Sequence, residues 1–181
     1  MSGSTPFPLS RPQSVDNLTS RGIEVTIEAS EGERAALAEI LDIIGIDSLT
    51  ATFTVKPWRK EGVKVAGVVS ADVVQACVVT LEPVVQHLRE EVEVTFLPGA
   101  EPIDPDAEIE LDLDAPDLPE PLEGGRIDLG AIAAEHMALG LDPYPRAPGV
   151  EFNDLIEDDG SNDEPASPFA DLARLKGEGE T

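Results

Sequence analysis

Regular alternation of apolar and polar residues first appears at residues 23–28, within GIEVTIEAS. This pattern predicts a strand with one buried face. In the following SEGERAALAEILDIIG, apolar residues recur three and four positions apart, which is typical of a helix with one apolar face. Ser30 and Glu33 predict a capping box at the start of this helix, and Gly45 predicts its end. The apolar face consists of Leu37, Ile40, Leu41 and Ile44.

A series of strands is expected after this helix. LTATFTVKPW (49–58) and HLREEVEVTFLPG (87–99) alternate apolar with polar residues, and AEIELDLDAP (107–116) predicts an edge strand with one acidic face. GVKVAGVVS (62–70) and ADVVQACVVTL (71–81) are rich in valine and predict two strands paired with each other. Short strands this close in sequence favour antiparallel pairing.

The second predicted helix is DLGAIAAEHMALGL, which Asp128 caps and Pro143 ends. We therefore expect an α+β domain with a mainly antiparallel sheet and two principal helices. The predicted organisation is an N-terminal arm at 1–20, the α+β domain at 21–150, an acidic disordered linker at 151–166 and a short C-terminal helix at 167–176.

Charge distinguishes the two halves of the chain. The 181 residues carry a formal net charge of −25. Residues 1–100 contain 8 basic and 14 acidic residues, whereas residues 101–181 contain 4 and 23. Such a charge repels nucleic acid at long range and favours basic partners, although high solubility alone is a simpler explanation of it.

Other parts of the sequence limit location and chemistry. It has no apolar run near twenty residues, and its start lacks the features of a secretory signal, so we expect a cytoplasmic protein with no membrane contact. Cys77 is the only cysteine, and its valine-rich surroundings favour a buried core residue over a reactive thiol. His87 and His136 have no second metal ligand at a recognised spacing. We therefore expect no catalytic residue, no metal, no cofactor and no enzymatic activity.

One basic stretch, KPWRKEGVK, stands out against the acidic background. Lys56, Arg59, Lys60 and Lys64 surround Trp58, the only tryptophan. An aromatic ring among cations can contact RNA by stacking. A solvated hairpin turn, with Trp58 covering an edge of the core, explains the same residues.

Three segments together resemble a known family. They are CVVTLEPV, GGRIDLGAIAAEHMALGLDPYPRAPG and SPFADLARLK. In this order they look like the YceD family of large ribosomal RNA subunit accumulation proteins, in its alphaproteobacterial form. The resemblance covers roughly residues 5–176. Many members carry two cysteines before the Glu-Pro or Lys-Pro step; Cys77 matches the first, but Thr80 stands at the second.

The resemblance implies a non-enzymatic bacterial role in ribosome biogenesis, with large-subunit ribosomal RNA accumulating as the result. It leaves open whether this acidic protein binds a large-subunit ribosomal protein, a precursor ribosomal particle or the RNA itself through Lys56–Lys64. The matching stretch supplies candidate partner-binding residues, namely Asp128, Leu129, Glu135, Leu139, Pro143, Tyr144, Pro145 and Arg146.

The predicted C-terminal helix is too short to be stable alone in water, so it needs a surface to fold on. Ser167, Pro168 and Gly177 suit its two ends. Its surface is either the chain's own domain or a groove on a partner protein. For the second alternative, the predicted contacts are Phe169, Leu172, Leu175 and Lys176.

Overall fold

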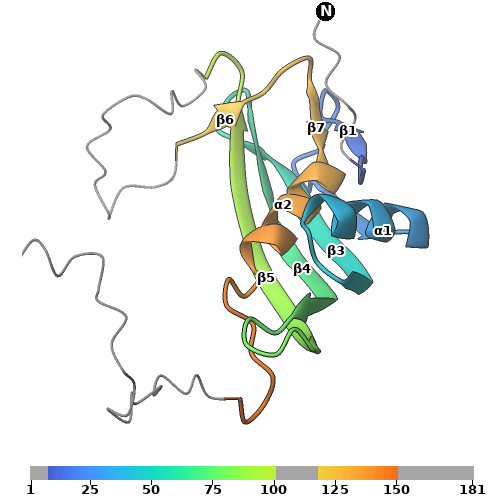
Figure 1. Ribbon diagram of the computed structural model, residues 1–181. Helices are drawn as coiled ribbons and strands as arrows, with labels where there is room; N and C mark the ends of the chain where they lie inside the picture. Colours follow the sequence, from blue (N-terminus) through green and yellow to red (C-terminus); the bar gives the residue numbers. More distant parts are fainter. Residues whose placement is uncertain (1–7, 101–117, 151–181) are drawn as a thin grey trace, which may run out of the picture. The chain divides into compact units, whose positions relative to one another are not determined.

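A five-stranded sheet forms the centre of the protein (Figure 1). The computed structural model describes residues 8–100 and 118–150. Neighbouring strands of the sheet are antiparallel, except for a short parallel pairing of the last two. Across the sheet, the strands are β2 (Ile23–Glu28), β3 (Gly45–Trp58), β4 (Gly62–Ala76), β5 (Pro83–Leu97) and β6 (Glu120–Pro121).

Two helices and a small second sheet complete the fold. Both helices, α1 (Glu31–Ile40) and α2 (Leu129–Leu139), lie against the same face of the large sheet (Figure 1). The small sheet pairs β1 (Pro12–Ser14) with β7 (Arg126–Asp128). This arrangement confirms the predicted α+β class with a mainly antiparallel sheet.

The core lies between the helices and the sheet, and alternation along the strands creates it. Phe53, Val55, Val65 and Val69 are fully buried, whereas Thr52 between two buried residues of β3 is exposed. Each buried side chain of this size stabilises the fold by roughly 2 kcal/mol. We call the face of the large sheet away from the helices the open face.

Helix α1 begins as predicted and ends earlier than predicted. The Ser30 hydroxyl accepts a hydrogen bond from the Glu33 amide, and the Glu33 carboxylate accepts one from the Ser30 amide, which confirms the capping box. The predicted end at Gly45 is wrong. Asp42 adopts a φ of 52°, and the Ile43 amide donates to the carbonyl of Ala38 at 3.1 Å, which closes the helix after Ile40.

The early end of α1 also corrects its predicted apolar face. Leu37 is buried, but Ile40 and Ile44 are 60% and 55% exposed. Ile44 lies beyond the helix, so the four apolar residues do not share one helical face. Of the apolar pattern predicted for this helix, only the part around Leu37 corresponds to side chains that are buried against the sheet.

Strand β4 corrects a second prediction. Residues 62–70 and 71–81 do not form two paired strands, because residues 62–76 form a single strand that pairs with both β3 and β5. Gly67 does not interrupt it; a Cβ atom there would clash with the carbonyl oxygen of Thr52 on β3. Cys77 is buried as predicted, but it lies in the turn after the strand.

Asp128 caps α2 as predicted and also holds the N-terminal segment. One carboxylate oxygen accepts hydrogen bonds from the amides of Gly130, Ala131 and Arg11, the last at 2.7 Å. The other accepts from the Ser10 hydroxyl at 2.6 Å. Burial alone would raise the pKa of Asp128, but these hydrogen bonds outweigh burial and lower it.

The prediction that Pro143 ends α2 is wrong, because the helix ends at Leu139 and Gly140 caps it. The predicted edge strand at 107–116, the linker at 151–166 and the helix at 167–176 lie outside the described residues.

The N-terminal segment is part of the packed structure from Pro8 onward. Leu9 is fully buried, and Arg11 forms a two-pronged ion pair with Glu33 of α1, with N···O distances of 2.7 and 3.0 Å. The hydrogen bond from Arg11, followed by that from the Ser30 amide, lowers the pKa of Glu33 to about 2. Arg11, which directly precedes β1, therefore attaches the N-terminal segment to α1.

The ion pair predicts a specific acid sensitivity. Because the folded-state pKa of Glu33 is depressed from 4.5 to about 2, its stabilising effect is present above pH 4.5 and is lost as the pH falls towards 2. We expect Glu33→Gln to lower the free energy of unfolding at pH 7 by about 1 kcal/mol. Urea denaturation between pH 2 and 7 measures this, and the variant should lose less stability on acidification.

Glu31→Gln provides the control for Glu33, because Glu31 is exposed in the same helical turn and forms no ion pair with any described residue. Equal losses in the two variants would show that general charge, and not the Arg11 contact, stabilises this region.

The cap of α2 gives a second prediction. Asp128→Ala removes the acceptor for four donors, so the free energy of unfolding should fall by about 2 kcal/mol. Asp128→Asn keeps one side-chain oxygen and should lose about half as much. Chemical denaturation distinguishes the two variants; an alanine variant as stable as the wild type would contradict the structural role of Asp128.

Candidate functional site

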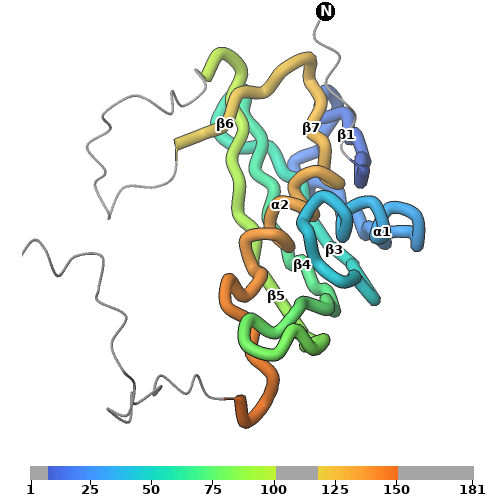
Figure 2. Tube along the Cα trace, in the orientation of Figure 1, coloured from blue at the N-terminus to red at the C-terminus, as the bar shows by residue number. Residues whose placement is uncertain are grey.

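The turn between β4 and β5 meets the segment that follows α2. Figure 2 shows the chain after α2 running down to this turn. The amide of Val78 donates to the carbonyl of Pro145 at 2.9 Å, and the amide of Ala147 donates to the Cys77 sulfur at 3.3 Å. Two of the three segments that carried the family resemblance meet here, namely 77–84 and the part of 124–149 at residues 141–147. Together they form one structural unit, which we call the junction.

Two glutamines of the sheet hold the junction in place. The side-chain amide of Gln86 donates to the carbonyl of Gly140 at 2.8 Å, and its oxygen accepts from the Asp142 amide at 3.1 Å. Gln75, only 8% exposed, donates to the carbonyl of Asp142 at 3.0 Å. The backbone after α2 is therefore fixed on both sides by side chains from β4 and β5.

Cys77 is the buried centre of the junction. A hydrogen bond from the Thr80 side chain, followed by those from the amides of Ala147 and Thr80, lowers the pKa of the Cys77 thiol to about 7. The thiol is fully buried, and its contacts join the turn to the 141–147 segment. A buried sulfur that accepts backbone hydrogen bonds positions this loop.

The junction presents apolar side chains to solvent. Leu81 and Tyr144 are 78% and 70% exposed, and Val78 and Val79 are also exposed. Leu81 has a φ of 62°, a left-handed conformation that a side chain with Cβ rarely adopts and that orders the turn around it. We call Val78, Val79, Leu81 and Tyr144 the junction patch. Exposed apolar side chains gathered on a firmly held loop are typical of a protein-binding surface.

The structure separates the candidate partner-binding residues into buried and exposed groups. Leu129 is fully buried, Pro145 is buried, and the carboxylate of Asp128 is engaged by four donors. The exposed group consists of Glu135, Leu139, Pro143, Tyr144 and Arg146. The candidates Phe169, Leu172, Leu175 and Lys176 lie outside the described residues.

Most of the junction patch and both glutamines are absent from the residues that the sequence predicts to bind a partner. The sequence pattern places Leu81 at the end of a strand and Val78 and Val79 in its interior. One signal was available: Gln75 and Gln86 are polar residues in otherwise valine-rich strands. A polar side chain on the buried face of a strand needs a hydrogen-bonding partner, and here the partner is the backbone after α2.

The basic stretch forms the turn between β3 and β4, at the opposite end of β4 from the junction. The guanidinium of Arg59 lies over the Trp58 ring, 4.0 Å from its centroid, and Lys64 forms an ion pair with Glu93 at 2.6 Å. Lys56 and Lys60 are exposed. Arg59 thus occupies one face of the Trp58 ring that a base could otherwise stack on, and the ion pair with Glu93 offsets the positive charge of Lys64.

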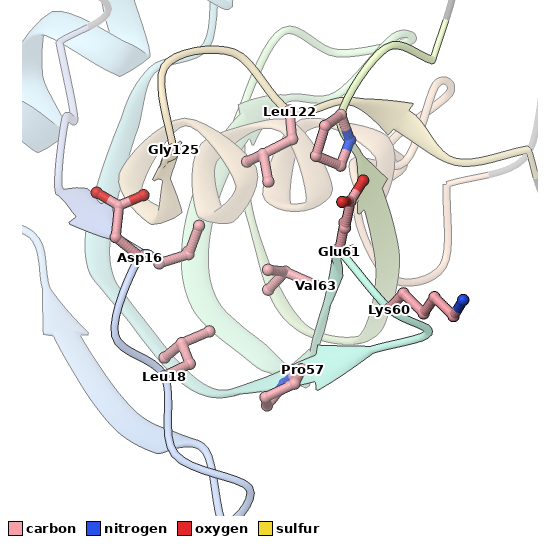
Figure 3. Close-up of a pocket in the computed structure, with 11 residues that line it drawn as sticks. Asp16, Leu18, Pro57, Lys60, Glu61, Val63, Leu122 and Gly125 are labelled. Carbon is pink, nitrogen blue, oxygen red and sulfur yellow. The ribbon is translucent and has the colours of Figure 1, made fainter.

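A pocket of about 450 Å³ lies beside this turn (Figure 3). Leu18, Val63 and Leu122 line it with apolar surface, and Asp16 and Glu61 add carboxylates. Figure 3 shows the Lys60 side chain extending away from the cavity. The wall of this pocket does not suit a phosphate group, because the carboxylates of Asp16 and Glu61 repel anions.

A serine, an aspartate and a histidine meet on the open face. The carboxylate of Asp72 accepts hydrogen bonds from Ser48 at 2.8 Å and from His87. The contact with His87, followed by that with Ser48, lowers the pKa of Asp72. Ser48 and His87 both contact the aspartate and not each other, so the histidine does not activate the serine as a nucleophile.

The described residues contain neither a metal-ligand cluster nor a membrane-spanning helix. No group of three or more metal-ligating side chains occurs among residues 8–100 and 118–150. In the same part of the chain, neither helix is long and apolar enough to cross a membrane.

Comparison with known proteins identifies the family. Residues 65–176 match the sequence model of the large ribosomal RNA subunit accumulation protein YceD. No curated protein and no solved structure matches the chain. The matched region spans more than half of the sequence and includes both segments that form the junction. The chain therefore belongs to the YceD family, whose name implies a role in the accumulation of large-subunit ribosomal RNA.

Proposed function

We propose that this protein is a non-enzymatic, acidic binding factor that acts in the cytoplasm on a large-subunit ribosomal protein or a precursor particle. By holding such a partner until it joins the RNA, it would allow the large-subunit ribosomal RNA to accumulate. The observation that supports this proposal best is the junction, where two segments within the family match combine to expose the junction patch.

Charge supports a basic protein partner over bare RNA. Residues 101–117 contain eight acidic and no basic residues, and residues 151–181 contain ten acidic and two basic residues. Phosphate binding gains affinity from lysine and arginine, which are scarce in this chain, whereas ribosomal proteins that bind RNA offer many cations. Carboxylates can shield those cations until RNA replaces them.

Direct RNA binding is the second candidate function. Exposed Lys56, Arg59 and Lys60 favour it, since all three lie close together in sequence where β3 leads into the turn before β4. The contact between Arg59 and Trp58 and the ion pair of Lys64 with Glu93 reduce what this turn can offer a nucleic acid.

Affinity capture distinguishes the two functions. We expect the full chain to retain large-subunit ribosomal proteins from a nuclease-treated extract at low salt and to release them at high salt. Ribosomal RNA should not bind to the purified protein alone. Tight binding of naked RNA, with a salt dependence that Ala substitutions of Lys56, Arg59 and Lys60 reduce, would instead favour the second function.

The junction patch gives a third prediction. Leu81→Ser combined with Tyr144→Ser should weaken capture of the ribosomal partner about tenfold, because two apolar contacts are lost. The melting temperature should stay within a few degrees of the wild-type value, because both side chains are exposed.

Ile40→Ser combined with Ile44→Ser is the matched control, since these residues are comparably exposed on another surface. Equal weakening in both double variants would show that general hydrophobicity, and not the junction, binds the partner.

A further inference from the structure

The outer edge of β5 is the longest strand edge that the described residues leave without a partner. The strand has fifteen residues, and β6 pairs only with Phe96 and Leu97 at its end. Figure 2 shows β6 beside that end alone, with no other strand along the outer side of β5. An unpaired strand edge presents rows of N–H and C=O groups that can bond a further strand.

Carboxylates lie on both faces of the sheet along the half of this edge nearer β6, beyond the exposed Arg89. Glu91 and Glu93 project from the open face, and Glu90 projects from the face covered by α2. Of these three, only Glu93 forms an ion pair with a described residue. Glu120 of β6 and Glu135 of α2 add two more negative charges nearby.

Two of these carboxylates lie in surroundings that favour the arrival of a cation. Glu90 lies beside Gly140 at the C-terminal end of α2, where the helix dipole is negative. Burial, and then repulsion from Glu135, raise the pKa of Glu120, although the nearby His136 opposes this effect. A positively charged ligand at this edge would relieve both unfavourable interactions.

We propose that the outer edge of β5 binds an extended, basic segment of a protein partner by β-strand addition. Backbone hydrogen bonds to the strand edge would supply affinity, and the carboxylates would select lysine and arginine. This inference rests on the proposed function and names the surface and the conformation of the bound partner segment. RNA cannot satisfy the strand edge in this way and its phosphates are repelled by the carboxylates.

Charge also argues against an internal occupant. The segment 107–114 of the same chain alternates apolar residues with four carboxylates. Pairing it with β5 would bring like charges together, whereas pairing a basic segment brings opposite charges together.

The test uses the full chain and a labelled twelve-residue peptide in which lysine alternates with valine or threonine. We expect binding that protects alternate amides of β5 from hydrogen exchange. A peptide of equal charge with two valines replaced by proline should bind at least tenfold more weakly, because proline removes backbone donors. Fluorescence anisotropy measures affinity, and NMR assigns the protected amides.

Paired charge reversals locate the peptide. Glu91→Lys with Glu135→Lys should weaken binding about tenfold, since two contacts become repulsive. The control, Glu24→Lys with Glu28→Lys, changes net charge equally on β2, the opposite edge strand, and should weaken binding less than threefold.

The outcomes separate this inference from the proposed function. Equal weakening by both pairs of substitutions, or equal affinity for the proline peptide, would overturn strand addition and leave charge-driven partner binding intact. Protection of β5 amides in the free chain that disappears when residues 107–114 are deleted would assign the edge to the chain itself and also overturn the proposal. Failure to retain any large-subunit ribosomal protein would reject the proposed function independently.

Discussion

The carboxylate of Asp128 is the contact on which the remaining architecture depends. It accepts hydrogen bonds from the first turn of α2 and from Ser10 and Arg11, more than one hundred residues earlier in the chain. Arg11 in turn binds Glu33 of α1. One side chain thereby fixes where α2 starts and attaches the N-terminal segment to both helices. Because α2 is rigid, its starting point also fixes where the following segment reaches the sheet.

The position of α2 explains why two segments within the family match meet at the junction. The helix delivers Gly140 and Asp142 to Gln86, and the next residues pack on the turn that contains Cys77. The side chains of Gln75, Gln86 and Cys77 form hydrogen bonds that hold backbone in place, and the junction patch exposes apolar side chains beside the exposed Glu82 and Arg146. In the proposed function, the apolar junction patch and the acidic groups along β5 would together suit a partner that is both basic and partly extended.

Sequence patterns predicted the parts of this fold that local physics determines. Ser30 and Asp128 cap helices by accepting hydrogen bonds from neighbouring amides, so their roles could be predicted from a few residues. The end of α1 could not be predicted in this way, because Asp42 adopts a left-handed conformation that glycine usually adopts. The continuity of β4 was hidden by Gly67, whose tolerance depends on the close approach of β3. The junction joins residues 67 to 70 positions apart, and no local pattern encodes such a contact.

The length of β4 sets the scale on which a partner must act. Its fifteen residues separate the basic turn at Gly62 from the junction at Cys77. At about 3.3 Å per residue, the two ends are roughly 50 Å apart. A metabolite or a single nucleotide could occupy one end but never both. Simultaneous contact with both ends therefore requires a ligand of macromolecular dimensions.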